Sequence, residues 1–201
     1  AAKTLGNIGN VQKGLGDYAK ALSTHEQALE ELRALGDRRN AAGTLGNIGN
    51  VYSRLGANAK ALSSYEQALA EQQALGDRRG AAGTLHNVAI VYRSLGDYDK
   101  ALSIYEQAYA ESKALGNEAG AATTLGALGS IYADLGDYAK ALSTHEQALA
   151  QAEALGTKVG AATTLNSIGS VYESLGDHVK ADRKSTRLNS SHRCISYAVF
   201  C

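Results

Sequence analysis

Apolar and small side chains recur along this chain at spacings of three and four residues, which is the pattern of one face of an α-helix. In two consecutive segments that face is made by Leu45, Ile48, Gly49, Tyr52 and Leu55, and then by Ala61, Tyr65, Ala68 and Leu69. Both segments therefore predict amphipathic helices. Neither segment shows the strict alternation that is typical of a β-strand.

The same pattern returns every 40 residues. The unit starts as AAKTLGNIGN at residue 1, AAGTLGNIGN at 41, AAGTLHNVAI at 81, AATTLGALGS at 121 and AATTLNSIGS at 161. A Leu-Gly pair closes each half of the unit, and LGDYAKALSTHEQAL occurs identically at residues 15–29 and 135–149. A fixed period of this length is typical of folds that stack one supersecondary unit many times.

Each predicted helix ends in glycine, the residue that most readily adopts the left-handed conformation of a C-terminal cap. A residue able to cap the next helix follows directly. The candidate N-caps are Asp17, Asp97, Asp137 and Asp177 for second helices, and Asp37, Asp77, Asn117 and Thr157 for first helices. Ala57 has no side-chain acceptor, so we expect the start of the following helix to be weaker by about 1 kcal/mol.

Short turns between the predicted helices force neighbours to run antiparallel, and an isolated pair buries too little apolar surface to be stable, so pairs must stack. The mid-helix glycines Gly9, Gly49, Gly129 and Gly169, with Ala89 at the same position, are expected to contact Ala21, Ala61, Ala101 and Ala141 of the paired helices. We therefore predict an all-α fold, a solenoid of antiparallel helix pairs. It would span residues 1–181, with repeats at 1–40, 41–80, 81–120 and 121–160 and a partial repeat at 161–181.

The unit resembles the tetratricopeptide repeat. The spacing that carries the resemblance is that of Leu45, Ile48, Gly49, Tyr52, Gly56, Ala61, Tyr65 and Ala68. The unit is longer than the family's usual 34 residues, and the proline that ends the family's second helix is absent. Long repeats with GNxG, KAxxxxEQAL and GDR segments are similar to those of kinesin light chain, the Pins/LGN adaptors and bacterial multi-repeat signalling proteins. The resemblance implies a right-handed α-solenoid.

By this resemblance, the first helix of each pair lines a concave groove that binds a peptide. The candidate groove residues are Asn10 and Lys13, Asn50 and Arg54, His86 and Arg93, Ser130 and Asp134, and Asn166 and Glu173. They change from basic to acidic along the chain. We expect the acidic part of an extended or helical peptide near Lys13, Arg54 and Arg93, with Asn10 and Asn50 bonding its backbone. Ordinary solvated helix faces remain an alternative for each position.

The chain offers no set of residues that converges on a catalytic or metal site. His25 and His145 stand where Tyr65 and Tyr105 stand in other units, which predicts inter-helix packing. His86 replaces a glycine and has no partner at metal-ligand spacing, so a surface contact is expected. We predict no enzyme activity, no catalytic residue, no metal and no cofactor.

The sequence therefore predicts a protein-protein interaction scaffold whose partner is a protein or peptide ligand. The alternative is the regulatory or sensor arm of a larger bacterial signalling enzyme, with its effector domain outside this sequence. Neither a nucleic acid nor a membrane is an expected partner, because no basic face and no long apolar run is present. A cytoplasmic location is expected, and the uncapped ends of the solenoid could support head-to-tail self-association.

The segment at residues 182–201, DRKSTRLNSSHRCISYAVFC, has no counterpart in any unit. It resembles a translated sequencing adaptor, and a genuine basic tail is the alternative. The segment contains both cysteines and the one Phe, together with four of the 20 basic and one of the 20 acidic residues. The repeats themselves are therefore mildly acidic, although the formal net charge of the 201 residues is zero.

Overall fold

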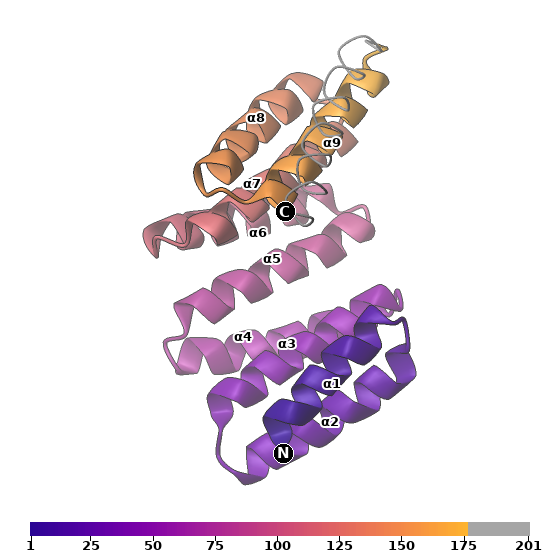
Figure 1. Cartoon of the computed structure of the whole chain (residues 1–201), viewed down its shortest axis with the longest axis vertical. Helices are drawn as coiled ribbons and strands as arrows, with labels where there is room; N and C mark the ends of the chain where they lie inside the picture. Colours follow the sequence, from indigo (N-terminus) through magenta and orange to yellow (C-terminus); the bar gives the residue numbers. More distant parts are fainter. Residues whose placement is uncertain (177–201) are drawn as a thin grey trace, which may run out of the picture. The chain divides into compact units, whose positions relative to one another are not determined.

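In the computed structural model, residues 1–176 are described, and they form nine α-helices and no strand. The helices are α1 (Ala2–Gly14), α2 (Tyr18–Ala34), α3 (Arg38–Arg54), α4 (Asn58–Ala74), α5 (Arg78–Ser94), α6 (Tyr98–Ala114), α7 (Glu118–Asp134), α8 (Tyr138–Ala154) and α9 (Lys158–Ser174). Figure 1 shows consecutive helices running antiparallel along the chain. The predicted all-α repeat fold is confirmed. The expected cap Asp177 and the segment 182–201 lie outside the described residues.

The chain divides into two compact units, Ala1–Glu111 and Ser112–Cys201. In the first unit α1 packs on α2, α2 on α3, α3 on α4 and α4 on α5. In the described part of the second unit α7 packs on α8 and α8 on α9. Each helix thus contacts its neighbours in the sequence, as in a helical repeat protein of the solenoid class.

The helix ends follow the predicted pattern with one exception. The glycines that close the helices all have positive φ, from 63° at Gly76 to 81° at Gly16. The side chains that accept a hydrogen bond from the main-chain N–H three residues later are Asp17, Asp37, Asp77, Asp97, Asn117 and Asp137. Ala57 makes no such bond, as predicted. The prediction for Thr157 is wrong, because its Oγ1 donates to the carbonyl of Ala152 at 3.0 Å instead.

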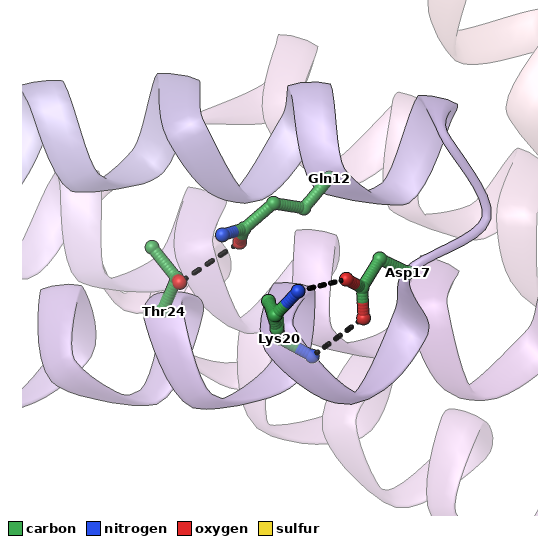
Figure 2. A network of polar contacts seen from close by, with 4 residues as sticks. All are labelled: Gln12, Asp17, Lys20 and Thr24. Carbon is green, nitrogen blue, oxygen red and sulfur yellow. Dashed lines mark hydrogen bonds and ion pairs between the residues drawn. The ribbon is translucent and has the colours of Figure 1, made fainter.

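A lysine completes the cap at the start of several second helices. Figure 2 shows Asp17 accepting from the main-chain N–H of Lys20 and, at 2.7 Å, from its Nζ. The same view shows Thr24 Oγ1 donating to Gln12 Oε1 at 2.8 Å, a bond that joins α2 to α1. Further along the chain the ion pairs are Lys100 with Asp97 at 2.9 Å and Lys140 with Asp137 at 3.1 Å. These exposed pairs support the caps and add little stability of their own.

Aromatic rings, and not alanines, explain the mid-helix glycines. A methyl group added at Gly49 would lie 2.6 Å from Cε1 of Tyr65, and one added at Gly9 or Gly129 would meet the ring of His25 or His145. The expectation that these glycines contact alanines of the paired helix is therefore wrong. The ring projects one turn beyond the alanine and covers the glycine backbone. His25, Tyr65, Tyr105 and His145 are all buried, which agrees with the packing role predicted for the histidines.

Candidate functional site

The ten candidate residues all lie on the first helix of a pair. The first unit carries Asn10 and Lys13 on α1, Asn50 and Arg54 on α3, and His86 and Arg93 on α5. The second unit carries Ser130 and Asp134 on α7, and Asn166 and Glu173 on α9. The half-buried members are Lys13, Asn50, His86, Arg93 and Ser130, and the remaining five are exposed.

Two of the predicted basic residues come close together. Helices α1 and α3 are in contact, and the positive charge of Arg54 lowers the pKa of Lys13, although partial burial of Lys13 is the larger cause. Within residues 1–176, neither side chain forms an ion pair. Two neighbouring cations therefore lack an opposite charge, and their mutual repulsion is relieved when an anion binds between them.

The carboxamide of Asn50 is oriented by a residue from the paired helix. Tyr65 donates its hydroxyl hydrogen to Asn50 Oδ1 at 2.7 Å, and burial raises the pKa of Tyr65 to about 12, so the hydroxyl remains a donor at neutral pH. The Nδ2 group of Asn50 has no partner among the described residues. Asn50 thus presents two N–H donors in a fixed direction, as recognition of a peptide carbonyl requires.

His86 is packed and not simply a surface residue. Its ring centroid lies 5.1 Å from that of Tyr105, with an angle of 66° between the planes, which is an edge-to-face contact. Burial lowers the pKa of His86 and so favours the neutral imidazole. Burial also raises the pKa of Tyr105 to about 12, against the opposing effect of the Arg93 charge. Arg93 and His86 therefore lie on the same aromatic side chain.

The candidate residues of the second unit have a different local environment. Ser130 donates its hydroxyl hydrogen to the carbonyl of Gly126 at 3.2 Å, a bond within its own helix. The main-chain carbonyl of Asn166 accepts a similar bond from Ser170 at 3.2 Å. The exposed carboxylates Asp134 and Glu173 give this face its acidic character.

The tyrosines that shape the face were not predicted as part of the site. Tyr65 and Tyr105 belong to second helices, and their periodic position predicts packing alone. The available signal was that each tyrosine stands 15 residues after a groove position, across a helical hairpin from it: Asn50 for Tyr65 and Ile90 for Tyr105. The described residues contain no group of three or more His, Cys, Asp or Glu side chains placed to hold a metal ion. None of the described helices is long and apolar enough to cross a membrane.

Comparison with protein families settles what kind of repeat this is. The tetratricopeptide repeat profile matches residues 1–70, 40–113 and 120–184. The chain belongs to the tetratricopeptide repeat family. A comparison with curated proteins gives no match.

Solved structures share the fold of this tetratricopeptide repeat protein. BtubC from P. vanneervenii is 25% identical with a TM-score of 0.81, over 96% of this chain and 80% of BtubC. A Rap protein complexed with Competence and Sporulation Factor is 20% identical with a TM-score of 0.84, over 93% of this chain. The chain spans about half of that protein, 52% of its length. Nearly identical kinesin light chain TPR-like repeats from Podosopora anserina give a TM-score of 0.75 at 16% identity, over 97% of this chain and 96% of theirs.

Proposed function

We propose that this tetratricopeptide repeat protein is a non-catalytic interaction scaffold that binds the acidic part of a peptide on the face formed by α1, α3 and α5. The observation that carries the proposal is the Lys13 and Arg54 pair, two adjacent cations that lack an ion-pair partner among the described residues. A carboxylate between them removes their repulsion and forms charge-assisted hydrogen bonds, which are about twice as strong as neutral ones.

Asn50 supplies the second element of the proposed binding mode. Its Nδ2 donates to a main-chain carbonyl of the peptide, while Tyr65 holds the other end of the carboxamide. Because the side chain is already fixed, little conformational entropy is lost on binding. Asn10, one repeat earlier, has the same role in the proposal, although His25 replaces the tyrosine there.

Two further observations support a peptide ligand. Structures with the same fold include a Rap protein in complex with Competence and Sporulation Factor and the Rap conjugation gene regulator of plasmid pLS20 in complex with the Phr* peptide. In the second unit, Asp134 and Glu173 replace the basic residues at the same repeat positions. We propose that this second face attracts basic residues of a partner.

A peptide array tests the proposal directly. The wild-type protein and the double variant Lys13→Glu with Arg54→Glu are probed against acidic, neutral and basic peptides of equal length. The expected result is loss of binding to acidic peptides in the double variant. Arg33→Glu, an exposed residue on α2, is the matched control and should leave the preference unchanged. An identical preference in the double variant and the wild type would refute the proposed site.

The regulatory arm of a larger signalling protein would use the same face. The Rap structures favour this second candidate, since the chain spans only about half of the protein that binds Competence and Sporulation Factor. Sequencing the complete gene distinguishes the two candidates, because an effector domain next to the repeats would identify a regulatory arm. The same sequence would test whether residues 182–201 belong to the natural protein.

A further inference from the structure

The first unit contains a pocket of about 290 Å³ between the end of α4, the start of α5 and the last turns of α6. Ala81 and Leu85 give it an apolar wall, and both are half-exposed. The residues at the same positions one repeat earlier, Ala41 and Leu45, are each 6% exposed and lie in the core. The pocket is therefore a local feature of this repeat. None of its lining residues is among the ten candidate peptide-binding residues.

A glycine at the third position of α5 leaves a carboxylate oxygen exposed to this pocket. One repeat earlier, Asn40 Nδ2 donates to Oδ2 of the capping Asp37 at 2.6 Å. Gly80 occupies the corresponding position and has no side chain. Asp77 Oδ1 still accepts from the Gly80 N–H at 3.0 Å, but Oδ2 has no hydrogen-bond or ion-pair partner within the described residues. The carboxamide that completes the cap in one repeat is missing in the next.

A buried carboxamide supplies a donor beside that oxygen. Gln72 is only 6% exposed, and its Oε1 accepts from Thr84 Oγ1 at 2.9 Å. Its Nε2 donates to no other described residue. A methyl group added at Gly80 would lie 3.0 Å from Gln72 Nε2 and 2.9 Å from Asp77 Oδ2. The empty position above Gly80 is thus flanked by one acceptor and one donor.

The remaining charges of the pocket satisfy each other. Arg78 donates to Glu111 through Nε at 2.5 Å and through Nη2 at 3.0 Å, a bidentate pair. A ligand therefore meets the unpaired oxygen of Asp77 and the N–H of Gln72. An ammonium group would satisfy Asp77 but oppose the Gln72 donor, and a carboxylate would be repelled by Asp77. A primary carboxamide has both an N–H donor and a carbonyl acceptor on one carbon, which matches both groups.

We propose that this pocket binds a primary carboxamide on a short apolar stem. Its N–H donates to Asp77 Oδ2, its carbonyl accepts from Gln72 Nε2, and its stem packs on Ala81 and Leu85. The ligand is then either the glutamine or asparagine side chain of a partner peptide or a free small amide. The site is independent of the acidic-peptide face.

Titration of the ¹⁵N-labelled full chain with N-acetylglutamine methylamide, followed by NMR, tests the site. Chemical-shift changes should be confined to the residues around Asp77, and N-acetylglutamate methylamide should produce none. Asp77→Asn should weaken binding at least tenfold without loss of the cap, since Asn117 caps α7 with its Oδ1. Gly80→Asn should abolish binding, because the new side chain occupies the site as Asn40 does one repeat earlier.

A matched variant keeps the test specific. Asp37→Asn changes the equivalent cap in a repeat where Leu32 replaces the glutamine, and it should leave the affinity unchanged. Binding of the capped glutamine but not of free L-glutamine assigns the site to a partner's side chain, and the reverse assigns it to a free amide. The proposal is overturned if neither compound binds, if the capped glutamate binds equally well, or if Asp77→Asn and Gly80→Asn retain wild-type affinity.

Discussion

The two glycines in the middle of α3 provide a matched pair for measuring how closely its helices pack. Gly46 has no atom within 4 Å of the place where a methyl group would be added. At Gly49 the same methyl group would lie 2.6 Å from Cε1 and 2.7 Å from Cδ1 of Tyr65. Both positions are inside one helix, so the intrinsic helix preference for alanine over glycine applies to both. The difference between the two alanine variants therefore isolates the contact with the ring.

The expected magnitudes follow from these distances. Gly46→Ala should raise the free energy of unfolding by about 1 kcal/mol, the usual difference in helix propensity. Gly49→Ala gains the same term, but the methyl group overlaps a ring that is 1% exposed and tied to Asn50 by its hydroxyl. Overpacking of this kind costs about 1–3 kcal/mol. Gly49→Ala should therefore be less stable than Gly46→Ala by about 1–3 kcal/mol.

Urea unfolding of both variants, followed by circular dichroism, measures this difference. Because the two substitutions lie in the same repeat, any local unfolding of that repeat affects both equally. Ala89 shows that the repeat accepts alanine at this position when the ring is differently held: Tyr105 faces Ile90 in place of an asparagine and contacts His86. Equal stabilisation by the two substitutions would refute the argument that Tyr65 requires glycine opposite it.

The remaining predictions concern a helix cap and a buried histidine. Ala57→Asp should stabilise the protein by about 1 kcal/mol by capping α4, whereas Ala59→Asp, in the same turn, should give a smaller gain in urea unfolding; equal gains would contradict a capping effect. His25 should make stability fall as the pH drops below its ordinary pKa of 6.5, because burial, aided by the charge of Lys13, lowers its folded pKa and only the unfolded chain takes up the proton. His25→Tyr should flatten the pH dependence of unfolding between about pH 7 and 5, and unchanged slopes would refute this origin.

Local signals predicted the helices and most of their caps. The glycine and the capping residue that follow each helix act within a few residues, so Asp17 and Asp37 could be identified from the sequence. The choice made by Thr157 could not, because its hydroxyl can donate to the carbonyl of Ala152 as well as accept from an amide, and the competition is decided by small differences in backbone geometry.

Contacts between helices were harder to predict than the helices themselves. The positions of Gly49 and Ala61 on facing helices follow from periodicity, but which side chain fills the space depends on the rotamer of Tyr65. The coupling of Lys13 to Arg54 agrees with the register of the repeats. The pocket at Asp77 follows from the absence of a side chain at Gly80 and from the buried amide of Gln72, neither of which is part of the repeating pattern.

The rings that cover glycines also bear on how the helices find their partners during folding. The sequence from Leu15 to Leu29 is repeated identically from Leu135 to Leu149, so α2 and α8 carry the same histidine in the same surroundings. The glycines that receive these rings, Gly9 and Gly129, are also alike. Helix α2 of one molecule is therefore a chemically acceptable partner for α7 of another. Exchange of helices between copies, a known failure of repeat proteins, competes with correct pairing when the protein refolds at high concentration.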